Sequence, residues 1–288
     1  MSDQPTRVVD AHVHIWDPAR SDWYPYLSHT PEEGAGDATR MYRRFDVDLY
    51  KAETAGWNVE KFVNVAAATG RHSIEETIEL DGAAQASGGP DAIIGGLPPT
   101  DTVAEAIELI DRQMAAPRFR GVRQMGGLGG PLPDVAVLRA LHERNLVFEL
   151  MTLADQLRAA AAQLADFDDL VVVIEHTGWP RSGSDEERAL WRAGIDALSG
   201  LGDNVMCKLS GLAMPLGSTR VDTLGPWLEY AIEAFGVDRC MFASNFPVDA
   251  MHGTFDQLYT TFSAVTAGLD SESRAKLFAS NAERVYRC

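Results

Sequence analysis

Apolar runs of strand length recur eight times along this chain, and longer segments of helical pattern lie between them. Several runs are almost continuous in Val, Ile, Leu or Phe, as strands buried on both faces of a parallel sheet are. Repeated strand–helix units predict a parallel sheet covered by helices. The predicted strands cover residues 7–14, 61–66, 92–97, 119–124, 146–151, 170–176, 205–210 and 239–244.

Eight such units in 288 residues fit a (β/α)8 TIM barrel, which needs about 250 residues. An open doubly wound sheet would carry a Gly-rich phosphate loop after its first strand, whereas this first run ends in histidines. The predicted helices cover residues 46–55, 73–86, 102–115, 134–143, 154–165, 185–198, 221–235, 255–267 and 271–286. We therefore expect one α/β domain over residues 1–288, a TIM barrel with a long loop after strand 1.

That long loop, residues 17–45, exceeds an ordinary strand-to-helix connection. It is rich in aromatic residues, among them Trp23, Tyr24 and Tyr26. A loop of this kind is either a lid over the barrel mouth or a surface flap packed by its own aromatic side chains. Trp16, just before it, and Tyr24 within it are candidate substrate contacts.

The formal net charge of −17 would repel nucleic acid phosphates and anionic lipid. The chain has no apolar run long enough for a membrane span and no signal-peptide pattern at its start. Its three cysteines form no CxxC pair. We expect a cytoplasmic protein that acts on a small molecule and binds neither nucleic acid nor membrane, with a homo-oligomer left open.

Catalytic groups of barrel enzymes project from the C-terminal ends of the strands. His12 and His14 end the first strand and, being two residues apart, point to one face. Neutral imidazole is a common metal ligand, so this pair predicts a divalent-metal site if further ligands come from other strands. The alternative is two histidines satisfied by hydrogen bonds. The sixth strand ends in Glu175 and His176, and His176 is a candidate ligand or proton donor.

Lys208 and Glu149 each interrupt an apolar strand with a charge, which is costly to bury alone. Either they pair with a neighbour, such as each other, or they act at the site. In that second case Glu149 contacts a metal or a substrate hydroxyl, and Lys208 polarises a carbonyl or binds a carboxylate. Arg123 either presents its planar guanidinium to a carboxylate or forms a salt bridge with a neighbouring element.

Five ordered segments resemble the amidohydrolase superfamily, in the branch of TIM-barrel hydrolases that contains L-fuconolactonase, L-rhamnonolactonase and pyrone-dicarboxylate lactonase. They are VDAHVHIWDP at 9–18, FRGVR at 119–123, IEHTGWP at 174–180, CKLSGL at 207–212 and MFASNFPVD at 241–249. The resemblance spans nearly the whole chain. It implies a divalent metal, zinc where present, bound by His12, His14 and His176, and hydrolysis of the ester bond of a sugar or acidic lactone.

The resemblance breaks at one position. In that branch the last strand normally ends in Ser-Asp-(Trp/Phe)-Pro, and its aspartate ligates the metal and takes a proton from the attacking water. Asn245 stands there in this chain, and an amide cannot accept that proton. Asp249, Glu149 or His176 is then the candidate base, or a metal-activated water needs none. The branch also resembles members that work without metal, so a metal-free site is the alternative.

The leading hypothesis is a lactonase. The candidate catalytic residues are His176, Asn245, Asp249 and Lys208, and the candidate substrate contacts are Arg123, Glu149, Trp16 and Tyr24. Two other hypotheses stay open. One is a nonoxidative decarboxylase or hydratase of the same superfamily. The other is a noncatalytic barrel that binds a small acidic ligand and has lost its base at Asn245.

Overall fold

Eight parallel strands lie side by side in chain order and form the barrel that the sequence predicts. The structure, a computed structural model, describes residues 4–27, 37–125 and 130–288. The strands are β1 (Val8–Val13), β2 (Val59–Val65), β3 (Ala92–Leu97), β4 (Phe119–Gln124), β5 (Val147–Leu150), β6 (Val172–Ile174), β7 (Val205–Leu209) and β8 (Cys240–Phe242). Beyond β8 the chain reaches β1 again, because Asn245 N donates to the His12 carbonyl and His14 N donates to the Phe246 carbonyl.

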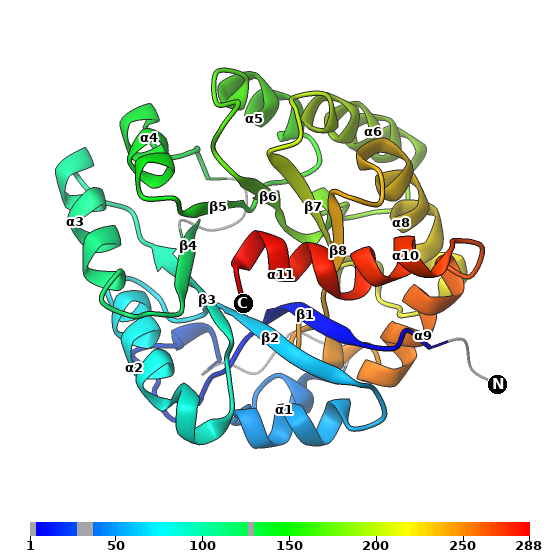
Figure 1. Ribbon diagram of the computed structural model, residues 1–288, viewed down its shortest axis with the longest axis horizontal. Coiled ribbons are helices and arrows are strands. Elements are labelled where there is room, and N and C mark those ends of the chain that lie inside the picture. Colours follow the sequence, from blue (N-terminus) through cyan, green and yellow to red (C-terminus); the bar gives the residue numbers. More distant parts are fainter. Residues whose placement is uncertain (1–3, 28–36, 126–129) are drawn as a thin grey trace.

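A ring of helices surrounds the strands (Figure 1). The helices are α1 (Val47–Thr54), α2 (His72–Ser87), α3 (Val103–Gln113), α4 (Val135–Glu143), α5 (Leu157–Leu164), α6 (Asp185–Ser199), α7 (Ala213–Leu216), α8 (Val221–Phe235), α9 (Phe255–Val265), α10 (Ser271–Ala275) and α11 (Asn281–Tyr286). Six of them begin after a side chain that caps free backbone N–H groups, namely Asp46, Thr102, Asp134, Ser184, Thr254 and Asp270. Within the described residues, no helix is long and apolar enough to cross a membrane.

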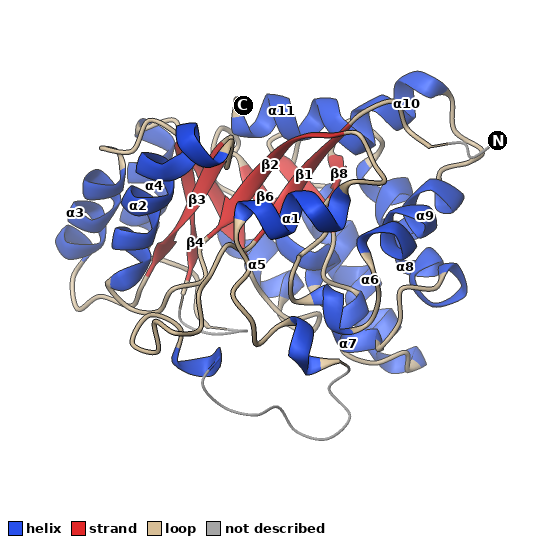
Figure 2. Ribbon diagram, turned by 90° about the horizontal axis from the view of Figure 1, so that it is seen from below, coloured by secondary structure: helices blue, strands red, loops and turns tan. Residues whose placement is uncertain are grey.

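The predicted helix 271–286 is broken into three pieces, because a π-helical turn, Lys276–Ser280, separates α10 from α11. This closing segment covers the end of the barrel where the strands begin, opposite α7 (Figure 2). Ala282, Val285 and Tyr286 pack against the apolar side chains inside the barrel. The C-terminal helix therefore plugs one end, and the other end is left for a site.

Alternating residues of the strands face the barrel interior or the helices. In β1, Val9 and Ala11 belong to the interior cluster, whereas Val8 and Val13 pack outside. The pairing of β1 with β2 shifts register between Asp10 and Val13. Such an irregularity re-aims side chains, and His12 and His14 both meet at the mouth as a result.

Gly121 allows β4 and β5 to approach closely. It pairs with Val147 across the two strands, and a Cβ added at Gly121 would lie 2.1 Å from the Val147 carbonyl oxygen. A backbone atom cannot yield as a flexible side chain can, so this position requires glycine.

We expect Gly121→Ala to lower the free energy of unfolding by about 1–3 kcal/mol, because β5 would have to move away from β4. Urea denaturation followed by circular dichroism measures this. Gly56→Ala is the control, since its methyl group would meet no atom within 4 Å, and it should leave the midpoint unchanged. Equal midpoints for the two variants would contradict this packing.

Candidate active site

The two histidines of β1 meet at their ring nitrogens. His12 Nε2 lies 3.2 Å from His14 Nε2, and both rings are buried. His14 Nδ1 lies 2.8 Å from the Val65 carbonyl oxygen, which can only accept, so the proton is on Nδ1. The lone pair of His14 Nε2 therefore faces the neighbouring ring, as it would face a metal ion.

A backbone turn at the end of β6 brings His176 to the same place. The chain leaves the strand at Ile174, two residues before the predicted end, and His176 and Thr177 have φ of 53° and 56°. The left-handed conformation is unfavourable for such residues and persists at functional sites where the surroundings fix it. The His176 ring centroid lies 4.6 Å from that of His12.

One hydrogen bond and one glycine accommodate that turn. Trp191 Nε1 donates to the Thr177 carbonyl at 2.6 Å. A Cβ at Gly211 would lie 2.2 Å from His176 Nδ1, so glycine leaves the space that the ring occupies. The sequence motif around residue 211 did not suggest this role, which depends on a contact between β6 and β7.

The three imidazoles are neutral. Burial lowers the pKa of His14 to about 3, and it lowers the pKa values of His12 and His176 well below their usual range. The positive charges of Lys208 and Arg123 lower these pKa values further. Neutral imidazole is the form that binds a metal ion.

Lys208 and Glu149 pair with each other below the histidines. Lys208 Nζ lies 2.7 Å from both carboxylate oxygens of Glu149, and both side chains are fully buried. Tyr286 of α11 donates to Glu149 Oε1 at 2.6 Å. Lys208 Nζ also lies 3.4 Å from His12 Nδ1. The pair thus supports His12 from inside the barrel.

Arg123 and Glu175 face each other at the mouth. Arg123 Nη1 lies 3.4 Å from Glu175 Oε2, while Arg123 Nε and Glu175 Oε1 are buried without a hydrogen-bond partner. Burial raises the pKa of Glu175 to about 8, although Arg123 opposes this rise. No role was predicted for Glu175, although it is a charged residue directly after an apolar strand and lies within the IEHTGWP segment at 174–180.

Asn245 and Asp249 form a second polar pair at the β8 end. Asn245 Nδ2 donates to Asp249 Oδ1 at 3.0 Å, and Asp249 Oδ2 accepts from Ala213 N at 3.3 Å. The pair orients the amide so that Asn245 Oδ1 points away from Asp249. Burial raises the pKa of Asp249 to about 7.

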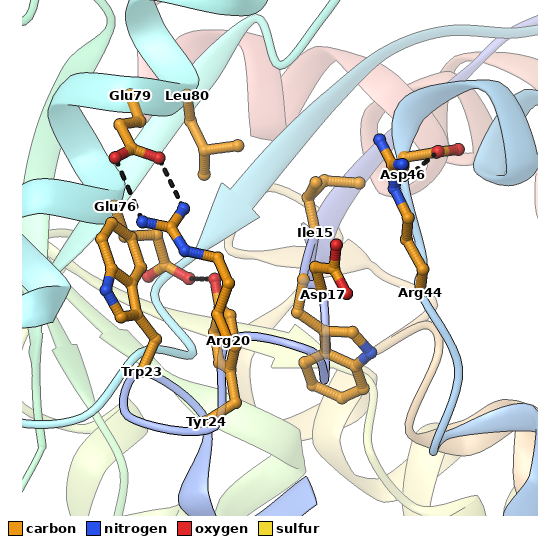
Figure 3. Close-up of a pocket in the computed structure, with 11 residues that line it drawn as sticks. Ile15, Asp17, Arg20, Trp23, Tyr24, Arg44, Asp46, Glu76, Glu79 and Leu80 are labelled. Carbon is orange, nitrogen blue, oxygen red and sulfur yellow. Dashed lines mark hydrogen bonds and ion pairs between the residues drawn. The ribbon is translucent and has the colours of Figure 1, made fainter.

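The two predicted aromatic contacts differ in the side chains they touch. Trp16 stacks on His14, with ring centroids 5.6 Å apart. Tyr24 instead donates to the buried Glu76 at 2.9 Å. Both line a side pocket of about 230 Å³, whose lining includes none of the three histidines (Figure 3). Tyr24 is therefore not brought to the histidine cluster.

The described parts of the loop 17–45 bridge two other loops. Thr69 N, after β2, donates to the Trp23 carbonyl, and Asp37 N donates to the Met251 carbonyl, after β8. Trp23, Tyr24 and Leu27 are buried. The centre of the loop, residues 28–36, lies outside the described residues, so lid and flap both stay predictions.

The donor set suits a divalent ion such as zinc. Within the described residues, one grouping of potential ligand atoms lies within 4.8 Å of one another, from His12, Glu175 and His176. His14 adds a lone pair beside His12, and Glu175 Oε1 is buried without a partner. Imidazole nitrogen and carboxylate oxygen are the ligands that zinc accepts alongside thiolate. The residues present therefore fit a metal.

Comparison with known proteins agrees with this geometry. The family model described as "Amidohydrolase" matches residues 9–288. An uncharacterised protein, y4mH of Sinorhizobium fredii, is 31% identical, covering 97% of this chain and 98% of its own length. L-fucono-1,5-lactonase of Burkholderia ambifaria is 27% identical, covering 97% and 95%.

A solved structure is also similar over its full length. It is a crystal structure of an amidohydrolase from Burkholderia multivorans with bound zinc. The TM-score is 0.81 at 25% identity, and the match covers 97% of this chain and 99% of that chain.

The raised pKa of Asp249 predicts how stability changes with pH. A rise from 3.8 to about 7 corresponds to roughly 4 kcal/mol. The protonated carboxyl stabilises the fold fully below about pH 4, and this contribution is lost as the pH rises to about 7. We therefore expect the free energy of unfolding to fall over that range more steeply in the native protein than in Asp249→Asn.

Urea denaturation at a series of pH values measures the two slopes. Asp101→Asn, at an exposed position, is the matched control and should follow the native slope. Parallel curves for the native protein and Asp249→Asn would contradict the assignment.

Proposed function

The chain belongs to the amidohydrolase family, and on this premise we propose that it is a metal-assisted hydrolase that opens the ester bond of a small sugar-derived or acidic lactone. One observation carries the proposal: three buried, neutral imidazoles converge at the barrel mouth beside an arginine. The similarity to L-fucono-1,5-lactonase supports the lactone as substrate class.

We propose that His12, His14 and His176 hold the metal ion. When bound there, a divalent ion supplies a Lewis acid that polarises an ester carbonyl and makes water more acidic. Such an ion reduces the need for a separate base, which matters because Asn245 cannot take a proton. The bound zinc of the Burkholderia multivorans amidohydrolase supports the choice of metal.

Hydrolysis adds water across the acyl C–O bond, so the acyl carbon gains a hydroxyl group and the ring oxygen gains a proton. Arg123 is the residue that binds the carbonyl group of the lactone. Its Nε is buried and free of partners, and its guanidinium can donate to the carbonyl oxygen as negative charge develops there. The same fork suits the carboxylate of the product.

The other predicted residues act through these groups. Lys208 and Glu149 neutralise each other and hold His12, so we propose positioning roles for both in place of direct substrate contact. Asp249 orients the Asn245 amide. The amide oxygen can then accept a hydrogen bond from water and align it without removing its proton. Trp16 limits the space beside His14.

We expect the zinc-loaded protein to hydrolyse members of a lactone panel that includes L-fucono-1,5-lactone, with product acid measured by chromatography. Dialysis against a chelator should abolish turnover, and zinc should restore it. Arg123→Gln should lower kcat/KM by about 10²–10³, as loss of one donor to a developing oxyanion does. The exposed Arg112→Gln is the matched control and should be unchanged.

Three results would contradict the proposal. Absence of lactone turnover with every divalent ion tried would exclude the reaction and favour a noncatalytic barrel. Release of carbon dioxide from aromatic acids would favour the decarboxylase. Full activity of Arg123→Gln would exclude Arg123 as the donor to the carbonyl oxygen of the substrate.

A further inference from the structure

Two consecutive side chains point into the same space at the end of β6. In an extended strand, neighbouring residues face opposite sides. Here the left-handed backbone of His176, with φ 53° and ψ 38°, turns both Glu175 and His176 toward the mouth. Glu175 Oε2 lies 3.7 Å from His176 Nε2, and the Glu175 side chain is fully buried. The strained turn therefore places a carboxyl group and an imidazole side by side at the barrel mouth.

The two buried glutamates near the histidines, Glu149 and Glu175, differ in what surrounds them. Both oxygens of Glu149 contact Lys208, and Oε1 also accepts from Tyr286. Glu175 Oε2 lies 3.4 Å from Arg123 Nη1 and 3.7 Å from His176 Nε2, and Glu175 Oε1 is buried without a hydrogen-bond partner. A buried polar atom of this kind needs an explanation, and an ion is one. Glu175 is thus the carboxyl group that remains available.

We infer that Glu175 is the anionic ligand of the metal site and supplies the negative charge that Asn245 does not. This inference rests on the proposed function, because it assumes that the site binds a divalent ion. The carboxylate ligand then comes from the end of β6, next to His176, and not from position 245 at the end of β8.

The charges of the site support this exchange. The charges of Lys208 and Glu149 cancel, the three imidazoles and the Asn245 amide are neutral, and Arg123 adds a positive charge beside Glu175. A divalent ion bound by neutral ligands alone would keep its full charge in a buried place, which is costly. A carboxylate ligand lowers that cost, and binding of the ion would displace the proton that burial favours on Glu175 in the metal-free protein. The potential ligand atoms of Glu175, His12 and His176 lie within 4.8 Å of one another, so one ion could contact all three.

The test measures zinc affinity by calorimetric titration against a competing chelator, with no substrate present. Glu175→Gln keeps the size of the side chain and removes its charge, so we expect zinc binding to weaken by about 100-fold or more, at or above the loss known for outer-shell changes. Asn245→Asp should strengthen binding. The double variant places the carboxylate at β8 instead of β6 and should return to within about 10-fold of the native protein, a coupling that a double-mutant cycle detects.

Glu108→Gln, at an exposed position, is the matched control and should bind zinc as the native protein does. Native-like binding by Glu175→Gln would overturn the inference. So would a native protein that binds no zinc while Asn245→Asp does. If that native protein still hydrolysed lactones, the hydrolase reaction would stand and only the metal and its ligand would be lost.

A second measurement needs no variant and so does not depend on whether Glu175→Gln folds. Anomalous scattering from a zinc-soaked crystal of the native protein should place a Glu175 oxygen about 2.0–2.2 Å from the ion. A zinc ion at the histidines with Glu175 outside its coordination sphere would overturn the inference.

Discussion

The buried ion pair of Lys208 and Glu149 joins the fold to the site. It connects β7 to β5, and Tyr286 of the plugging helix donates to the same carboxylate. Removing one partner of such a pair leaves an uncompensated charge and typically costs about 3–5 kcal/mol. Because the ammonium group also contacts His12, the interaction that closes the barrel interior also supports the first histidine. Barrel stability and site geometry therefore depend on the same contacts.

Much of this architecture could be predicted from the sequence, because it follows from local pattern. The strands at Ala92–Leu97 and Phe119–Gln124 and the helix at Val221–Phe235 have the predicted bounds. Apolar runs and amphipathic segments indicate directly which residues of a strand or helix are buried. The two-residue period of a strand predicted that His12 and His14 share a face, and the structure brings their Nε2 atoms to 3.2 Å. The register shift that turns this face toward the mouth was not predictable from that period. The pairing of Lys208 with Glu149 was one of two alternatives that buried charge left open.

The rest depends on contacts between distant segments. Glu175 faces the site only because His176 adopts a left-handed conformation, and that turn is held by Trp191 and by the missing side chain of Gly211. Strand alternation alone would place Glu175 and His176 on opposite faces. Tyr24 was expected near a substrate, yet its hydroxyl contacts Glu76 of α2. The local sequence pattern of a long loop does not predict which helix the loop will contact.

The proposed function depends on three neutral histidines that hold a divalent ion at the barrel mouth. Titration with Co²⁺, followed by visible absorption, tests it directly because the spectrum reports coordination geometry. We expect the intense bands of a site of low coordination number at one equivalent of Co²⁺, and we expect His14→Ala to lose them. A spectrum that stays that of hydrated Co²⁺, or bands that persist in His14→Ala, would contradict it.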